Sequence, residues 1–209
     1  MNSVLGREKL ARAACSLNAR CANGRLPALL LMTDEQRLAD PVETARALPR
    51  GSAVILRHTE AKTRASLARA LAKLAHERGL ILLIAGDPAL AARVGADGVH
   101  FSEARAREAA HWRALRPSWL ITAAAHSVRA VLNAGRARAD AVLLAPVFPT
   151  LSHRDRPALG ATRFRLVAGA VPIPIYALGG INAKSVTRLQ DAQLAGIAAI
   201  EGLTGPQSA

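Results

Sequence analysis

Eight short apolar runs recur along the chain, and this repetition constrains the fold more than any other feature. The runs cover residues 27–33, 52–57, 80–85, 97–101, 119–125, 140–146, 173–180 and 196–202. They are almost continuously apolar rather than alternating, which is typical of parallel strands buried on both faces. Stretches with helical periodicity separate them, for example "EAKTRASLARALAKLAHERG", which ends at Gly79. The sequence therefore predicts eight parallel strands that alternate with helices.

The turn after the first run decides between an open sheet and a closed barrel. An open doubly wound sheet usually carries a glycine-rich dinucleotide turn there, whereas this chain reads Met32-Thr33-Asp34-Glu35. We therefore predict a single (β/α)₈ barrel, the TIM barrel, with a closed parallel sheet. We expect residues 1–25 to form an N-terminal helical extension and residues 26–209 to form the barrel.

The end of the chain leaves too little sequence for the last helix of such a barrel. Only "LTGPQSA" follows the eighth run, so we expect a truncated final helix and an exposed apolar wall. The residues around Leu5–Leu17 place their apolar side chains on one helical face. We expect this N-terminal helix, or a symmetry mate in a homodimer, to cover the wall.

The composition narrows the classes of partner. The net charge of +13 raises affinity for anions, but only 3% of the residues are aromatic, so a stacking platform for nucleic acid is not expected. No apolar run reaches transmembrane length and the N-terminus has no hydrophobic signal core, which predicts a cytoplasmic protein without membrane association. Cys15 and Cys21 have no second pair or suitably spaced histidine, which favours free thiols.

Polar residues gather after the apolar runs, where a barrel of this kind has its active site. Four of the six histidines fall there, namely His58, His100, His126 and His153. Histidine transfers protons near neutral pH, so this cluster predicts catalytic groups, although each histidine alone is more typical of a hydrogen-bonded rim or core residue.

The pair Gly179-Gly180 follows the seventh run, where the backbone of such barrels often binds phosphate; a tight turn is the alternative. Asp34, Asp87 and Glu103 are the carboxylates at this end. Two of them could hold Mg²⁺ with a diphosphate, and solvated loop acids are the alternative.

Six motifs in order suggest a family: "AVILRHTEAKTR", "GADGVHFSE", "AAAHS", "PVFPT", "IPIYALGGIN" and "AGIAAIEGL". With these spacings, the chain from about residue 29 to residue 203 resembles the thiamin phosphate synthase/TenI family of barrels. The synthases of that family join a hydroxymethylpyrimidine diphosphate to a thiazole phosphate and use Mg²⁺. Its TenI-like members include a thiazole tautomerase, whose reaction needs no metal.

The resemblance implies roles for particular residues. The implied catalytic residues are His126, Arg57, Ser152 and His153; the implied substrate- or phosphate-binding residues are Thr150, Gly179, Gly180, Glu201 and Gly202; and the implied metal ligands are Asp87 and Glu103. Among the places where the chain departs from the family, His153 replaces a lysine, Arg105 replaces a metal-binding aspartate and Glu201 replaces a phosphate-binding serine. Since cations and metal stabilise the departing diphosphate, these changes predict that efficient synthase activity is absent.

Three interpretations stay open at this point. The first is a thiamin phosphate synthase-like transferase with Mg²⁺. The second is a TenI-like tautomerase in which His126 moves a proton, without a cofactor. The third is a barrel without catalysis that binds a small anion or a partner protein. In the two enzymatic interpretations the ligand is a small phosphorylated thiazole or pyrimidine.

Overall fold

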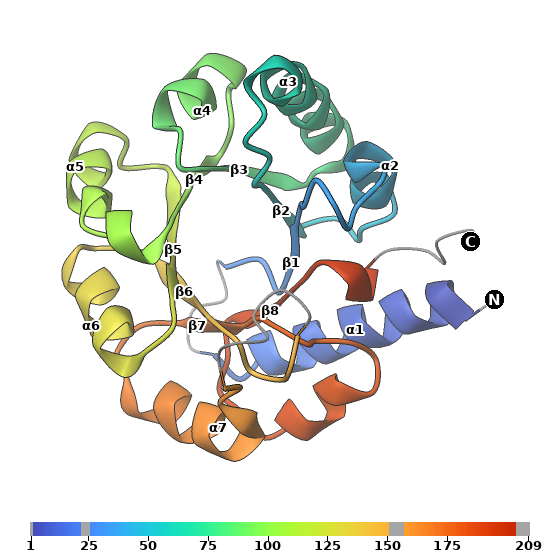
Figure 1. Cartoon of the computed structure of the whole chain (residues 1–209), viewed down its shortest axis with the longest axis vertical. Helices are drawn as coiled ribbons and strands as arrows, with labels where there is room; N and C mark the ends of the chain where they lie inside the picture. The colour runs from blue at the N-terminus through green and yellow to red at the C-terminus, as the bar shows by residue number, and fades with distance from the viewer. Residues whose placement is uncertain (1, 22–25, 151–156, 204–209) are drawn as a thin grey trace.

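The computed structural model describes residues 2–21, 26–150 and 157–203, and within them eight parallel strands close into a barrel in sequence order (Figure 1). The strands are β1 Leu29–Met32, β2 Ala53–Leu56, β3 Ile81–Ala85, β4 Gly98–Phe101, β5 Leu120–Ala125, β6 Ala141–Leu144, β7 Ile175–Ala177 and β8 Gly196–Ala199. The barrel closes through β8 and β1, where Leu30 pairs with Ala198. Each predicted apolar run contains one strand, so the predicted (β/α)₈ fold is confirmed.

Helices surround the barrel (Figure 1), and the stretch predicted to be helical up to Gly79 forms α3, which ends at Arg78. The α-helices are α1 Asn2–Asn18, α2 Pro41–Arg46, α3 Ala61–Arg78, α4 Pro88–Val94, α5 Glu108–Leu115, α6 Val128–Arg136 and α7 Gly160–Ala170. Short 3₁₀ helices follow three strands: η1 Glu103–Arg105, η3 Ser185–Leu189 and η4 Glu201–Leu203. Between β7 and β8 the described helical structure is only the 3₁₀ helix η3. No helix in the described ranges is both long and apolar enough to traverse a bilayer.

The side chains of the strands form two separate apolar layers. One layer lies between the strands and the helices and contains Val54, Val142 and Ile197. The other fills the barrel interior and includes Ile55 and Tyr176. Since successive side chains of a strand point to opposite faces, this division follows from the alternation along each strand.

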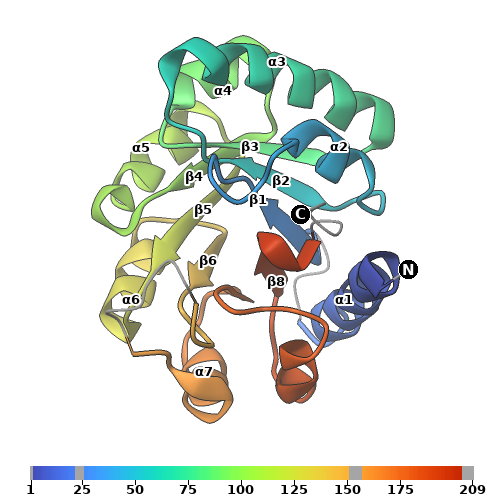
Figure 2. The same cartoon turned by 45° about the vertical axis from the view of Figure 1, so that its right-hand side comes forward.

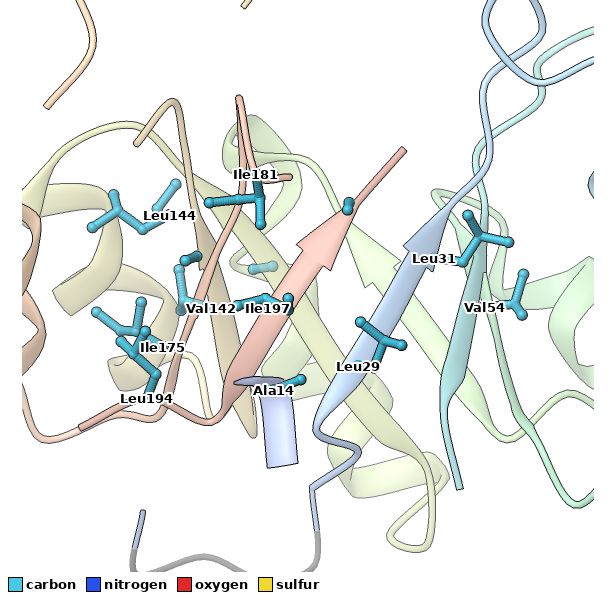
Figure 3. Packing of buried hydrophobic residues seen from close by; sticks show 14 of the residues in the cluster. Ala14, Leu29, Leu31, Val54, Val142, Leu144, Ile175, Ile181, Leu194 and Ile197 are labelled. Atoms are coloured by element: carbon cyan, nitrogen blue, oxygen red, sulfur yellow. The ribbon is translucent and has the colours of Figure 1, made fainter. Parts of the chain in front are cut away.

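The N-terminal helix α1 lies against the part of the barrel where the described residues after β8 form only the 3₁₀ helix η4 (Glu201–Leu203). It contacts β1, β8 and η4, and its residues Leu10, Ala14 and Leu17 are buried. Figure 3 shows Ala14 in front of the strands that carry Leu29 and Ile197. The extra N-terminal helix is therefore as the sequence predicts; the expected truncation of the final helix falls partly on residues 204–209, outside the described residues. The sequence left two candidates for covering this wall of the barrel, the N-terminal helix and a symmetry mate. In the structure the N-terminal helix α1 lies there.

Truncating Leu10 to alanine should destabilise the protein through the contact between α1 and the barrel. Leu10 is fully buried, and its loss is expected to lower the free energy of unfolding by about 2 kcal/mol, at the low end for such cavities because a peripheral helix can settle into the space. Leu5→Ala in the same helix is the matched control, since Leu5 is 58% exposed. Urea titrations followed by circular dichroism measure both variants, and equal effects would mean that α1 is not held by its buried face.

Candidate functional site

A cavity of about 360 Å³ opens at the carboxyl ends of β1, β2, β6, β7 and β8. Met32 at the end of β1 and Glu201 and Gly202 of η4 line the same cavity, and Figure 2 shows η4 directly after β8. The cavity brings together six of the site residues that the sequence predicts, and these are Arg57, Thr150, Gly179, Gly180, Glu201 and Gly202. Ser152 and His153, which were predicted to act beside them, lie outside the described residues.

The Gly179-Gly180 turn forms one wall of the cavity and requires glycine at both positions. Their φ angles are +93° and +65°, and a Cβ atom on Gly180 would lie 2.7 Å from the carbonyl oxygen of Pro149. The Phe148 N–H donates to the Gly179 carbonyl at 3.0 Å, which holds the turn against the end of β6. Within the described ranges, the N–H groups of both glycines have no hydrogen-bond acceptor. Two backbone donors are therefore available at the cavity wall.

A chain of charged side chains lies at the mouth of the same cavity, which Arg37, Arg57 and Glu201 line. The Asp34 carboxylate is bound by the guanidinium of Arg37 at 2.8 Å and also by that of Arg57. Arg37 in turn lies 3.8 Å from the carboxylate of Glu201. The order Arg57–Asp34–Arg37–Glu201 thus connects the end of β2 to the end of β8. Glu201 therefore lies beside an arginine. It is the residue that the resemblance places where the family has a phosphate-binding serine.

Asp34 is the centre of this ion-pair chain. Its Oδ1 atom accepts the N–H groups of Gln36 and Arg37, both at 3.1 Å, and its side chain is only 11% exposed. The hydrogen bond from the Arg37 side chain, opposed by partial burial, holds the pKa of Asp34 well below its ordinary value. Asp34 therefore stays ionised and fixes both arginines. Sequence reasoning did not identify Arg37, whose only signal is its place three residues after Asp34.

The histidines expected as a cluster have separate surroundings in the described structure. His58 lies in a shallow depression beside α3, where its Nδ1 atom is 2.9 Å from the Thr33 hydroxyl and burial lowers its pKa. His100 lies within β4 in the barrel interior, 2.9 Å from the Thr122 hydroxyl, and burial lowers its pKa to about 4. Neither residue lines the cavity. The expected histidine cluster at the rim therefore does not include these two residues. His100 faces the barrel interior because side chains alternate along β4, whereas His58 lies in the loop after β2 and contacts Thr33.

His126 is held by a carboxylate in a second, smaller cavity of about 280 Å³. The Oε2 atom of Glu103 accepts the backbone N–H of His126 at 2.9 Å and lies 2.8 Å from its Nδ1 atom. A carboxylate at this nitrogen selects the tautomer with the hydrogen on Nδ1. This second cavity lies beside α6 and α7, and it shares Ala145 with the larger cavity. Glu103 can therefore orient His126 for proton transfer, but next to the main cavity rather than inside it.

The two carboxylates predicted as metal ligands are both used by other groups of the protein. Asp87 caps α4 by accepting the N–H of Leu90 at 2.8 Å, and Glu103 binds His126. Arg105 lies on the same loops and binds Glu108. Among the described residues, no group of three or more histidine, cysteine or acidic side chains could hold a metal ion.

Comparisons with known proteins agree with the fold and with the motifs at this end of the barrel. Residues 29–203 match the family model TMP-TENI, described as thiamine monophosphate synthase. The thiamine-phosphate synthase of Chlorobium luteolum is 33% identical over 187 residues, covering 87% of each chain, and that of Pyrococcus horikoshii is 30% identical over 183 residues, covering 86% of this chain and 87% of the relative. The solved thiamine phosphate pyrophosphorylase from Pyrococcus furiosus superposes with a TM-score of 0.70 at 25% identity, covering 86% of this chain and 90% of that one.

Proposed function

The chain belongs to the thiamine monophosphate synthase family, and from this premise we propose that its main cavity binds a thiazole phosphate. The observation that carries the proposal is the pair of glycine N–H groups at a wall of the cavity that Arg37 and Arg57 also line. Phosphate oxygens accept hydrogen bonds from backbone amides, and guanidinium groups bind them bidentately. The volume of about 360 Å³ suits one small ligand.

The charges of the cavity favour a single phosphate over a diphosphate. Its wall carries the two arginines, and the carboxylates of Asp34 and Glu201 balance them. A neutral wall gives a diphosphate little electrostatic stabilisation, whereas a monophosphate can rely on the glycine amides. A ligand with one phosphate is therefore the better match, which in this family corresponds to the thiazole partner.

The residues present do not fit the Mg²⁺ that synthases of this family use. Asp87 and Glu103 are engaged within the protein, and a guanidinium lies on the same loops. Coupling with displacement of diphosphate would thus proceed without a metal contact and without a lysine at position 153. Each such contact contributes on the order of a few kcal/mol to the transition state, so we propose that efficient synthesis is absent.

A second candidate activity is proton transfer on the bound thiazole, and the Glu103–His126 pair favours it. A histidine oriented by a carboxylate can accept and return a proton, and this needs no metal. Because His126 lines the neighbouring cavity, the ligand would have to extend past Ala145 while its phosphate stays at Gly179-Gly180. Tautomerase activity therefore requires a ligand that reaches from the main cavity into the neighbouring one.

Two measurements test the proposal. Ligand-observed NMR should detect binding of thiazole phosphate to the wild-type protein and its loss in Gly180→Ala, whose new Cβ would collide with the Pro149 carbonyl. Gly51→Ala is the matched control, because Gly51 has a φ of +79° but no atom within 4 Å of the added Cβ. Thiamin phosphate formation from both substrates with Mg²⁺ should be at least about 100-fold slower than for the Pyrococcus furiosus relative assayed beside it.

The outcomes separate the candidate functions. Binding that survives His126→Ala while thiazole isomerisation is lost would support the tautomerase. Synthesis at the rate of the relative would contradict the proposed loss of coupling. No binding of thiazole phosphate by the wild-type protein would overturn both enzymatic proposals and leave a barrel without this ligand.

A further inference from the structure

The guanidinium of Arg105 occupies the space between the loops that follow β3 and β4. Its Nη1 atom donates to the carbonyl of Gly86 at 2.5 Å, and its Nε and Nη2 atoms bind the two carboxylate oxygens of Glu108 at 2.5 and 2.7 Å. The guanidinium also lies 5.8 Å from the centre of the Phe101 ring. All three nitrogen atoms of the side chain therefore have protein partners.

The partners of Arg105 are of the type that Mg²⁺ prefers, namely carbonyl and carboxylate oxygens. The Glu108 hydrogen bond, followed by the charges of Glu108 and Asp87, raises the pKa of Arg105 above its ordinary value. Arg105 in turn lowers the pKa of Glu108 through the same hydrogen bond. A permanent positive charge thus contacts oxygen atoms of Gly86 and Glu108, and the nearby charge of Asp87 stabilises it further.

A second arginine completes this arrangement at the end of β3. Arg64 of α3 donates to the carbonyl of Ala85, the residue before Gly86. Two consecutive carbonyls at this strand end are therefore each bound by a guanidinium. Gly86 has a φ of +67°, and a Cβ atom there would lie 3.4 Å from Nη1 of Arg105, so the loop lies close against the side chain.

We propose that Arg105 is a built-in cation that stands in the place of a divalent metal ion between the β3 and β4 loops, so that this barrel binds no Mg²⁺ there. A divalent ion at the same oxygens would meet a fixed positive charge at contact distance. Because its nitrogens are all engaged by the protein, Arg105 ties the two loops together but does not supply the contact to a departing diphosphate that a metal would. The inference does not depend on which ligand fills the main cavity.

Titration with Mn²⁺ alone, followed by the EPR signal of the free ion, tests this assignment. We expect the wild-type protein to show no Mn²⁺ site at sub-millimolar concentrations. Arg105→Asp should create a site whose Kd lies at least about tenfold below the highest Mn²⁺ concentration at which the wild-type protein shows none, since it replaces the cation by a third carboxylate beside Asp87 and Glu108. Arg107→Asp is the matched control, because it makes the same charge change at an exposed neighbour and should create no site.

Three results would overturn the inference. One is an equal gain of Mn²⁺ binding in Arg105→Asp and Arg107→Asp, which would reflect added negative charge alone. Another is a folded Arg105→Asp, as judged by circular dichroism, that gains no binding. The third does not depend on that variant folding: Mn²⁺ binding by the wild-type protein that Asp87→Asn abolishes. Since no thiazole phosphate is present, these results are separate from the test of the proposed function.

Discussion

Replacing Asp34 by asparagine should weaken the fold and at the same time strengthen the binding of anions. The substitution leaves Arg37 and Arg57 without the carboxylate that binds both of them. We expect a loss of about 2–3 kcal/mol in the free energy of unfolding, below the range for fully buried pairs because Arg57 is 43% exposed and solvent screens its charge. The substitution removes one negative charge, so the net charge at the cavity mouth rises by one and the affinity for inorganic phosphate and thiazole phosphate should rise about tenfold.

Urea titrations and isothermal titration calorimetry measure the two effects of this substitution. Asp191→Asn is the matched control, because Asp191 is 84% exposed and its ion pair with Arg165, at 3.8 Å, lies away from the cavity lining. It should leave both stability and phosphate affinity unchanged. Unaltered or weaker phosphate binding in Asp34→Asn would show that the ion-pair chain does not set the charge that a ligand meets. Because the pKa of Asp34 is lowered in the folded protein, its contribution to stability is present above the ordinary carboxyl pKa and is lost only in stronger acid.

The strands could be predicted from the sequence because their signal is local. Runs such as "PALLLMT" and "DAVLLAP" are apolar at every position, and only burial on both faces explains that pattern. The place of Gly179-Gly180 was predictable once the strands were assigned. In a parallel barrel the turn after β7 lies at the carboxyl end of the strands, where the main cavity opens.

The ion-pair chain could not be predicted, because its contacts join loops that are far apart in the sequence. Arg37 approaches Glu201 only once β1 and β8 are neighbours in the closed barrel. The histidine cluster could not be predicted for another reason. The place of a histidine after or within an apolar run does not give the direction of its side chain. In β4 the alternation was readable in principle: Val99 and Phe101 belong to the layer facing the helices, so His100 between them faces the interior.

Acid should destabilise the protein through His100 before it disrupts most of the carboxylates. Burial, with a smaller effect of the nearby Arg57 charge, lowers the pKa of His100 from 6.5 to about 4. Between these two pH values the unfolded chain binds a proton at this residue and the folded protein does not. The stability that His100 contributes is therefore present above pH 6.5 and is lost as the pH falls to about 4, by about 3 kcal/mol in all.

The comparison of wild type with His100→Asn isolates this effect, because acidic groups titrate in both proteins. Asparagine can still bond the Thr122 hydroxyl but takes up no proton, so its free energy of unfolding should fall about 3 kcal/mol less between pH 7 and pH 4. His76→Asn, at an exposed position of α3, should follow the wild-type profile. Urea titrations at several pH values measure all three proteins. Parallel profiles for wild type and His100→Asn would mean that His100 is protonated within the barrel, and the interior could then hold a charge beneath the cavity.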